Sequence, residues 1–260
     1  MKMQKKLLNA TTLKLLAVVL MVLDHIHQMW AMDGAPMWLT WLGRLVFPIF
    51  LFAMSESFHY TRSRKKLLLR LLIASCLMSG GNMLLESLLP NPDVVLMNNA
   101  FSTFFVAALY MLAYTFVREG IRDKKAGKVA GGILLFLAPV ATAIPLLILP
   151  GMETPAMWLV RMTLLVPNLF MVEGGPLMVL LGLLFYVFRR WRWAQIAALG
   201  LIAAISLAAQ GLASVQWFMV FAAVPIFLYN GEKGKGMKQF FYFFYPGHIY
   251  LLYVVATLMK

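Results

Sequence analysis

The chain has 260 residues, of which 62% are hydrophobic and 13% are charged, and its formal net charge is +13. Soluble domains are about 45–50% apolar and about 25% charged, so these numbers exclude a soluble globular domain, a disordered chain and a fibrous repeat. Several apolar runs reach the about 20 residues that a helix needs to cross a bilayer. The predicted fold class is therefore an all-α polytopic membrane protein.

Nine apolar segments separated by short basic loops are predicted to be transmembrane helices. No internal repeat is found among them, and we expect one integral membrane domain over residues 1–260. The predicted spans are residues 11–30, 38–58, 67–89, 99–117, 129–149, 168–188, 193–209, 215–229 and 240–259.

The basic residues predict an orientation for these spans. With nine spans, all but three of the 23 Lys and Arg residues fall on one side, and the exceptions are Arg44, Arg161 and Lys260. The positive-inside rule then predicts a cytoplasmic N-terminus and an external C-terminus. A tenth span near 155–172 would move later basic loops outside, so a re-entrant or interfacial helix is expected there. Because the charge marks a membrane face, we expect no nucleic-acid partner.

Polar side chains within the spans are the candidates for function. A charged side chain in hydrocarbon costs at least about 2.5–3.5 kcal/mol, so it usually faces a cavity or a partner. Most of these residues fall in the outer halves of the predicted spans, whereas Glu56 and His59 fall near an inner end and His248 near mid-depth. The outer group comprises Asp24, His25, His27, Gln28, Arg44, Asn82, Glu86, Asn98, Asn99 and Glu173.

Spacing leaves several readings of these residues open. Asp24 and His25 diverge by about 100° on a helix, while Asp24 and His27 share a face, so either histidine could be the reactive one. His248 could simply bond across helices, and Arg44 could be an interfacial anchor that snorkels outward. The basic run 62–66 is either a topology signal or a phosphate-binding patch. No metal-site spacing, P-loop or nucleophile elbow occurs.

Three blocks of sequence, in order, resemble one known family. The run LKLLAVVLMVLDHIH resembles the opening of the TraX family, membrane proteins named for the acetyltransferase that modifies conjugative pilin. GRLVFPIFLFAMSESFHYTRSRKKLLLRLL resembles its second block, and FFYFFYPGHIYLLY resembles its C-terminal block. The resemblance is strongest over residues 13–72 and 240–253, while 73–170 aligns little.

The resemblance implies acyl transfer from a coenzyme A thioester, in the manner of transmembrane acyltransferases. The donor would be cytoplasmic acetyl-CoA, and the acceptor an amine or hydroxyl on an exported peptide, a pilin-like protein or a small amine. The setting would be a bacterial cytoplasmic (inner) membrane, in contact with its lipid. The residues expected to bind the donor are Glu56, His59, Arg62, Arg64, Lys65, Arg70, Tyr245 and His248.

Such a reaction needs a base, an oxyanion donor and an orienting group. His25 is the predicted base with His27 second, Arg44 or Asn82 would stabilise the oxyanion, and Asp24 would orient the histidine. The residues expected to contact the acceptor are Asn82, Glu86, Asn99 and Glu173.

Two other classes of function are compatible with the same residues. A proton-coupled membrane transporter would also carry ionisable residues within its spans, but it often shows repeated halves. A non-catalytic assembly subunit would leave the clustering of polar residues in the outer half unexplained. The acyltransferase is the preferred interpretation of the three.

Overall fold

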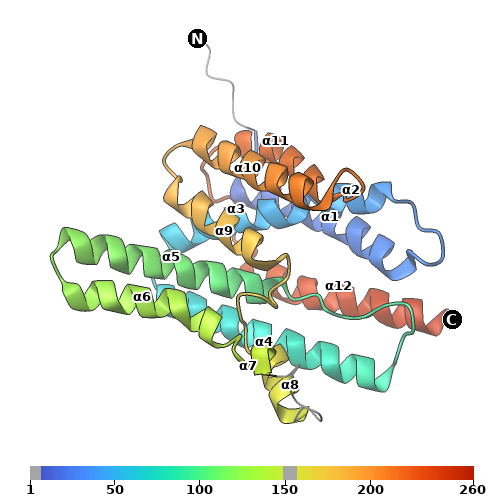
Figure 1. Cartoon of the computed structure of the whole chain (residues 1–260). Helices are drawn as coiled ribbons and strands as arrows, with labels where there is room; N and C mark the ends of the chain where they lie inside the picture. Colours follow the sequence, from blue (N-terminus) through green and yellow to red (C-terminus); the bar gives the residue numbers. More distant parts are fainter. Residues whose placement is uncertain (1–6, 149–156) are drawn as a thin grey trace. The chain divides into compact units, whose positions relative to one another are not determined.

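The computed structural model describes residues 7–148 and 157–260 (Figure 1). Lys2, Lys5 and Lys6, the end of the predicted span at Leu149 and the first residues of the predicted helix at 155–172 lie outside these ranges. Within them every regular element is a helix, and Leu8 and Tyr229 form an isolated β-bridge. The all-α prediction is confirmed for this part of the chain.

The helices follow one another with short connections. In chain order they are α1 (Ala10–Trp30), α2 (Trp38–Gly43), α3 (Val46–Tyr60), α4 (Arg64–Leu88), α5 (Ala100–Arg122), α6 (Ala126–Ala141), α7 (Pro145–Ile148), α8 (Met157–Leu165), α9 (Gly175–Val187), α10 (Arg192–Gln210), the 3₁₀-helix η2 (Gln216–Ala222), α11 (Ala223–Phe227) and α12 (Lys238–Leu258).

Seven helical segments within the described residues are long and apolar enough to cross a membrane. They are Ala10–Trp30, Trp38–Tyr60, Arg64–Leu88, Ala100–Arg122, Ala126–Leu147, Arg192–Gln210 and Lys238–Leu258. Judged by the length and composition of these helices, the chain is a multi-pass membrane protein. The predicted orientation of these spans stays a prediction.

The two other predicted spans, 168–188 and 215–229, are shorter than expected. Their helices are Gly175–Val187 and Gln216–Phe227, which rise about 18–20 Å against the about 30 Å of hydrocarbon. In the first, Asn168 Oδ1 accepts from the backbone N–H of Phe170 and Met171 at 3.2 and 2.9 Å. Because of this turn the helix begins only at Gly175, so the predicted start at residue 168 was too early.

Other boundaries also differ from the predicted ones. Helix α5 continues to Arg122, five residues beyond the predicted end, because a basic last turn suits the negative end of the helix dipole. Helix α6 ends at Ala141, two residues after the internal Pro139. Helix α8 has nine residues, too few to cross a bilayer, as the predicted non-spanning helix at 155–172 requires.

The contacts of the chain group into two compact units. The first unit comprises residues 1–53, 85–95 and 188–260, and the second comprises 54–84 and 96–187. The single domain expected over 1–260 stays a prediction.

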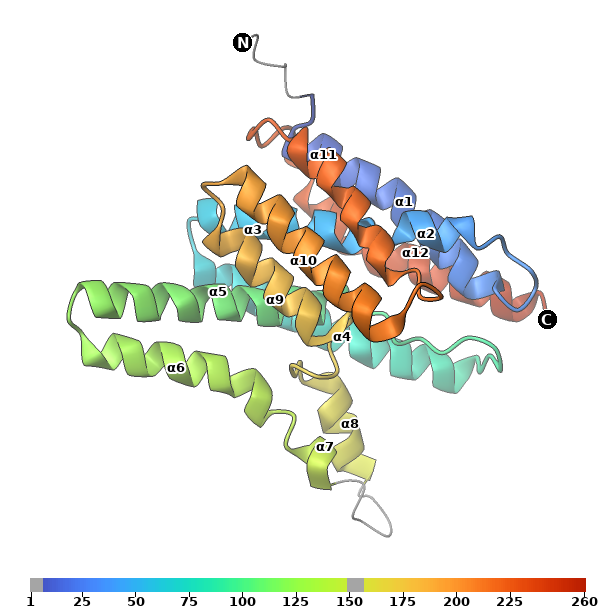
Figure 2. The ribbon, with the colours of Figure 1, turned by 45° about the horizontal axis from the view of Figure 1, so that its top comes forward.

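In the first unit, α1 packs against both α2 and α12, and α10 packs against η2 and α11. Helix α1 begins with Asn9, whose side chain accepts from the N–H groups of Thr11 and Thr12 and so caps the helix. Figure 2 shows α11 ending close to where α1 begins, and Leu8 N–H donates to Leu228 O at 3.2 Å. The beginning of α1 is therefore fixed to a distant part of the chain.

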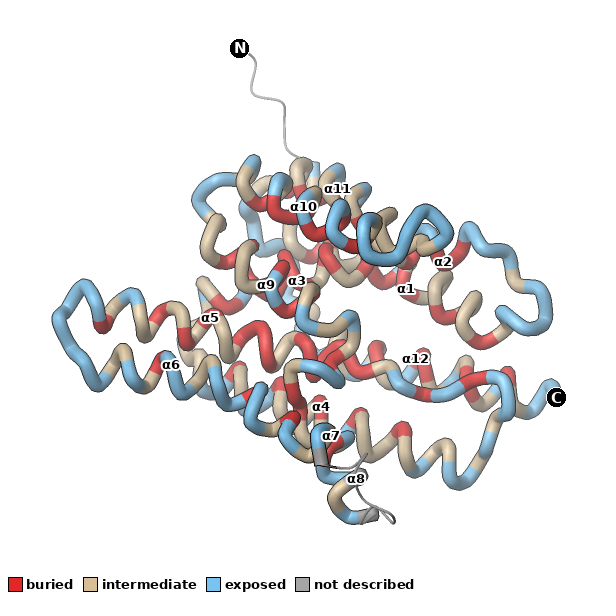
Figure 3. The backbone as a smooth tube through the Cα atoms, in the orientation of Figure 1, coloured by how far each residue is buried: buried red, intermediate tan, exposed pale blue. Residues whose placement is uncertain are grey.

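In the second unit, α5 contacts α6 and α9. Helices α5 and α6 form an antiparallel hairpin (Figure 2). Figure 3 shows buried residues recurring along α5, and its small side chains Ala107, Ala108 and Ala113 are fully buried. Small residues let helix backbones approach closely where lipid supplies no hydrophobic driving force between helices.

Candidate active site

Two histidines from opposite ends of the sequence form a buried pair in the first unit. Nδ1 of His25 on α1 lies 2.7 Å from Nε2 of His248 on α12. Their side chains belong to residues only 4% and 8% exposed, and their ring centroids are 4.9 Å apart. Each helix on its own buries a single histidine there, and the packing of α1 on α12 makes the pair.

The hydrogen bonds determine which nitrogens of this pair carry protons. His248 Nδ1 lies 2.7 Å from the carbonyl oxygen of Phe244, and since a carbonyl only accepts, this nitrogen must donate. In the neutral ring, Nε2 of His248 then accepts, so Nδ1 of His25 donates to it. The basic nitrogen of a neutral His25 is therefore Nε2. This chain of bonds sets the tautomer of His25, as the partners of catalytic histidines do.

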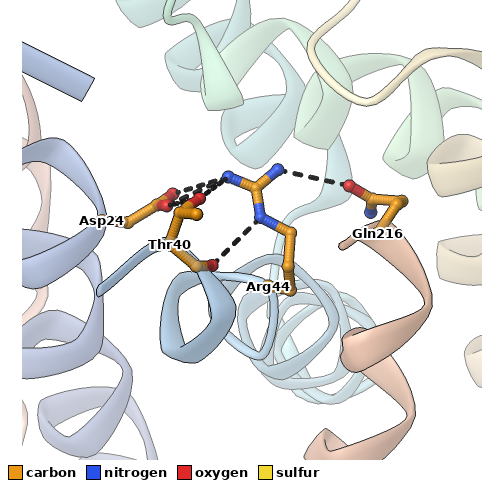
Figure 4. A network of polar contacts seen from close by, with 4 residues as sticks. All are labelled: Asp24, Thr40, Arg44 and Gln216. Atoms are coloured by element: carbon orange, nitrogen blue, oxygen red, sulfur yellow. Dashed lines mark hydrogen bonds and ion pairs between the residues drawn. The ribbon is translucent and has the colours of Figure 1, made fainter. Parts of the chain in front are cut away.

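A second polar cluster begins at the preceding residue of α1 (Figure 4). Asp24 Oδ1 accepts from Arg44 Nη2 at 3.0 Å and from Thr40 Oγ1 at 2.8 Å. Arg44 Nη1 donates to Gln216 Oε1 at 3.3 Å. The side chains of Arg44 and Asp24 are 30% and 21% exposed, so this is a partly buried ion pair with its geometry fixed from three elements.

The described part of the chain uses four of the five N–H groups of Arg44. Of its five N–H groups, Nε–H donates to Thr40 O at 3.3 Å, and the two on Nη2 serve Asp24 and Thr40 Oγ1. One on Nη1 serves Gln216. The remaining Nη1–H meets no acceptor among the described residues, which leaves a fixed cationic donor for a ligand.

Gly43 makes the approach of Asp24 to α2 possible. A Cβ atom added to Gly43 would overlap the Asp24 carboxyl group. The residue before Arg44 must therefore lack a side chain for the ion pair to form in this geometry.

Asp24 and His25 point to different neighbours. Asp24 bonds to Thr40 on α2 and to Arg44 at its end, whereas His25 bonds to His248 on α12. The divergence expected from their adjacent positions is confirmed. The carboxylate expected to orient the histidine is engaged by Arg44, and in its place His248 holds the ring of His25.

Tyr245 and His27 have different relations to this site. Tyr245 is 7% exposed, and its ring centroid lies 6.4 Å from that of His25 and 6.1 Å from that of His248. His27 is partly exposed and makes no hydrogen bond to any residue that the structure describes. Of the two histidines named as the base, His25 is the one in the buried pair.

Three of the residues expected to contact the acceptor gather in the second unit. Asn99 N–H donates to Glu173 Oε2 at 2.7 Å, and Asn99 Nδ2 donates to Ser79 Oγ at 2.9 Å. Asn82 Nδ2 donates to Asn98 O at 3.0 Å. Asn99 also caps α5, since its Oδ1 accepts from Ser102 N–H at 3.1 Å. The fourth of these residues, Glu86, belongs to the first unit.

Most residues expected to bind the donor also belong to the second unit. Glu56 and His59 lie in the last turns of α3, with the ring of His59 4.7 Å from that of Tyr60. Arg62, Lys65 and Arg70 are exposed, whereas Arg64 is half-buried. The Arg64 guanidinium lies 5.1 Å from the centre of the Phe58 ring. These exposed cations remain available to a phosphate group.

Three contributors to the site were not found from the sequence. Thr40 lies four residues before Arg44, and this i, i+4 spacing was a usable signal. Gln216 and the carbonyl of Phe244 gave none, because the first enters from a distant element and the second is a backbone group.

The fold and this site define a multi-pass helical membrane protein with a buried histidine pair beside an aspartate–arginine pair. The family model described as TraX protein matches residues 9–256. The chain therefore belongs to the TraX family. The comparison with curated proteins found no match, and the comparison with solved structures found none.

Proposed function

We propose that the protein is a membrane-embedded acyltransferase that moves an acetyl group from acetyl-CoA to an amine or hydroxyl. The observation that carries this proposal is the buried His25–His248 pair, in which a fixed tautomer leaves Nε2 of His25 basic. Membership of the TraX family supports the same reaction, because the family is named for a pilin acetyltransferase.

In the proposed reaction His25 acts as general base. The acceptor nitrogen attacks the thioester carbonyl carbon while Nε2 of His25 takes its proton, which forms a tetrahedral oxyanion. The C–S bond then breaks, the amide forms, and the proton passes from His25 to the departing sulfur of CoA. General acid–base catalysis of this kind contributes about 10²–10⁴ in rate.

Arg44 is the proposed donor to the oxyanion. Its remaining Nη1–H carries positive charge, and the bonds to Asp24, Thr40 and Gln216 hold the guanidinium still. A fixed donor of this kind is worth about 2.7–4 kcal/mol in the transition state. Asp24 is then a positioning residue that acts through Arg44.

The substrates are proposed from charge and from the family. Arg62, Arg64, Lys65 and Arg70 would attract the negatively charged donor to the membrane surface by long-range electrostatics. Tyr245 and His248 would contact the rest of the donor. The acceptor would be an exported peptide, a pilin-like protein or a small amine. The setting would be the bacterial cytoplasmic membrane.

The test is a transfer assay on purified protein. Wild-type protein in neutral detergent is given acetyl-CoA labelled in the acetyl group, together with peptides that have free N-terminal amines. We expect saturable binding of acetyl-CoA, release of CoA thiol, and label in the peptide. If the protein neither binds acetyl-CoA nor releases CoA thiol with any acceptor offered, the proposal is overturned.

A further inference from the structure

Helices α1 and α12 run in parallel and begin at the same end of the first unit. Near their starts, Lys14 Nζ lies 4.5 Å from the centre of the Phe241 ring. Further along both helices, His25 meets His248. The residue numbers rise together in the two contacts, so both helices run in the same direction from this end of the unit to the histidine pair.

A glycine-rich loop, residues 230–237, closes over this common beginning. Thr11 Oγ1 donates to the carbonyl oxygens of Lys233 and Lys235 at 3.1 and 2.5 Å, and Ala10 N–H donates to Glu232 O at 2.8 Å. Gly234 has φ +68°, which disfavours any side chain. A Cβ there would also overlap Asn9 Oδ1 and stand 2.8 Å from Thr11 Oγ1.

This loop and the two helix starts bring four ammonium groups to one end of the unit. Lys233, Lys235 and Lys238 are exposed, and Lys14 is half-buried against Phe241. None of the carboxylates that the structure describes is within ion-pair distance of these four. Glu232, inside the loop, accepts instead from Asn230 Nδ2 at 3.0 Å. The cluster is therefore a concentration of uncompensated positive charge, suited to a polyanion.

We propose that Lys14, Lys233 and Lys235 of the loop, and Lys238 at the start of α12 bind the phosphates of coenzyme A. The inference rests on the proposed function and deepens it, because it places a phosphate site in the unit that holds the histidine pair. Lys14 and Phe241 mark its inner wall, and the exposed lysines of the loop contact the 3′-phosphate and the diphosphate.

The spacing fits the length of the donor. His248 follows Lys238 by ten residues of α12, so it lies about 15 Å further along the helix axis. The pantetheine arm joins phosphate to sulfur through about twelve bonds, the length of about four extended residues or about 14 Å. With the phosphates on the loop, the thioester reaches the level of the His25–His248 pair.

Binding of CoA to charge variants tests this site. The loop variant K233Q/K235Q/K238Q removes three exposed charges. The control R118Q/K124Q/K125Q removes three exposed charges from the last turns of α5 and its connection to α6. Each protein is titrated with CoA by calorimetry, in neutral detergent and again in phosphatidylcholine nanodiscs. Dephospho-CoA and pantetheine serve as the ligands that lack one or all of the phosphates.

We expect the Kd of CoA to rise about tenfold in the loop variant, since three exposed charge pairs with phosphate are lost together. The control variant should bind as wild type does. The loss should shrink for dephospho-CoA and vanish for pantetheine. Should the loop variant fail to fold, as judged by thermal unfolding, K235Q alone must show a smaller loss of the same kind.

The outcomes separate this inference from the proposed function. Wild-type protein that does not bind CoA overturns both. Binding that is unchanged in the loop variant but lost in R62Q/R64Q/K65Q overturns the inference alone and leaves the phosphates on the other basic run. The loop lysines could instead hold anionic lipid headgroups. If the loop variant retains less phosphatidylglycerol than wild type but binds CoA equally well, the lysines bind lipid headgroups and the inference is overturned.

Discussion

The two units each hold a buried polar cluster, and the clusters differ in what they bond. In the first unit, side chains bond to side chains of other helices, as in His25–His248 and Asp24–Arg44. In the second, the amides of Asn99 and Asn82 bond to backbone groups, including Ser102 N–H and Asn98 O, and Asn99 also bonds to the hydroxyls of Ser75 and Ser79 on α4. A cluster of titratable groups that bond to one another can move protons, whereas amides that satisfy backbone groups hold helices in place.

The largest expected effect is on the histidine pair. His25→Ala should lower the rate of acetyl transfer by about 10²–10⁴, the contribution of a positioned base. His248→Ala should lower it in a similar way, because the tautomer of His25 is then no longer set. The double variant should lose little more than either single one, since residues that act as a unit are not additive.

The measurement is single-turnover transfer by the two single variants and the double variant, with thermal unfolding as the check on folding. Losses that multiply in the double variant would contradict a shared role for the two rings. Full activity in His25→Ala would remove the general base from the proposed mechanism.

Gly43→Ala should disrupt the Asp24–Arg44 cluster without removing a polar group. The added methyl overlaps the Asp24 carboxyl, and forcing it in should cost about 1–3 kcal/mol of the free energy of unfolding. It should also lower transfer, because Arg44 loses its partner. The matched control is Gly200→Ala in α10, where an added Cβ meets nothing within 4 Å and a helical alanine should stabilise. Equal stability of the two variants would contradict this packing.

Asn99→Ala tests whether the polar cluster of the second unit is structural. It removes the cap of α5 and the bonds to Ser75 and Ser79, and we expect a loss of about 1–2 kcal/mol of stability. Transfer per folded molecule should hardly change. If instead KM for the acceptor rises while unfolding is unaffected, Asn99 contacts the substrate, as the sequence led us to expect, and the contrast between the units fails.

The prediction of the fold from the sequence was based on hydropathy and charge. The long apolar runs predicted the seven long helices, because crossing a bilayer demands both length and composition. The predictions missed the late start of α9 and the division of 215–229 into η2 and α11. Those features depend on local bonds such as the Asn168 turn, which hydropathy does not record.

The sequence predicted which histidine and charged residues form the site, but it did not predict which of them bond to each other. His25, His248, Asp24 and Arg44 stood out because charge or imidazole inside a span is costly. The partner of His25 lies 223 residues away, and helical spacing within a single span gives no information about contacts at that distance. Asp24, the nearest carboxylate in sequence, was therefore chosen to orient His25, whereas the packing of α1 between α2 and α12 gave that carboxylate to Arg44.

The smallest expected loss of stability comes from changing Thr40, which connects both members of the ion pair. Its Oγ1 donates to Asp24 Oδ1 at 2.8 Å and accepts from Arg44 Nη2 at 2.8 Å. Thr40→Val keeps the shape and removes both bonds, which should cost about 1 kcal/mol and slow transfer about fivefold through a looser Arg44. Thr40→Ser keeps the hydroxyl and should restore most of the rate. If Val and Ser behave alike, the hydroxyl does not hold Arg44, and Thr40 contributes to this cluster through packing alone.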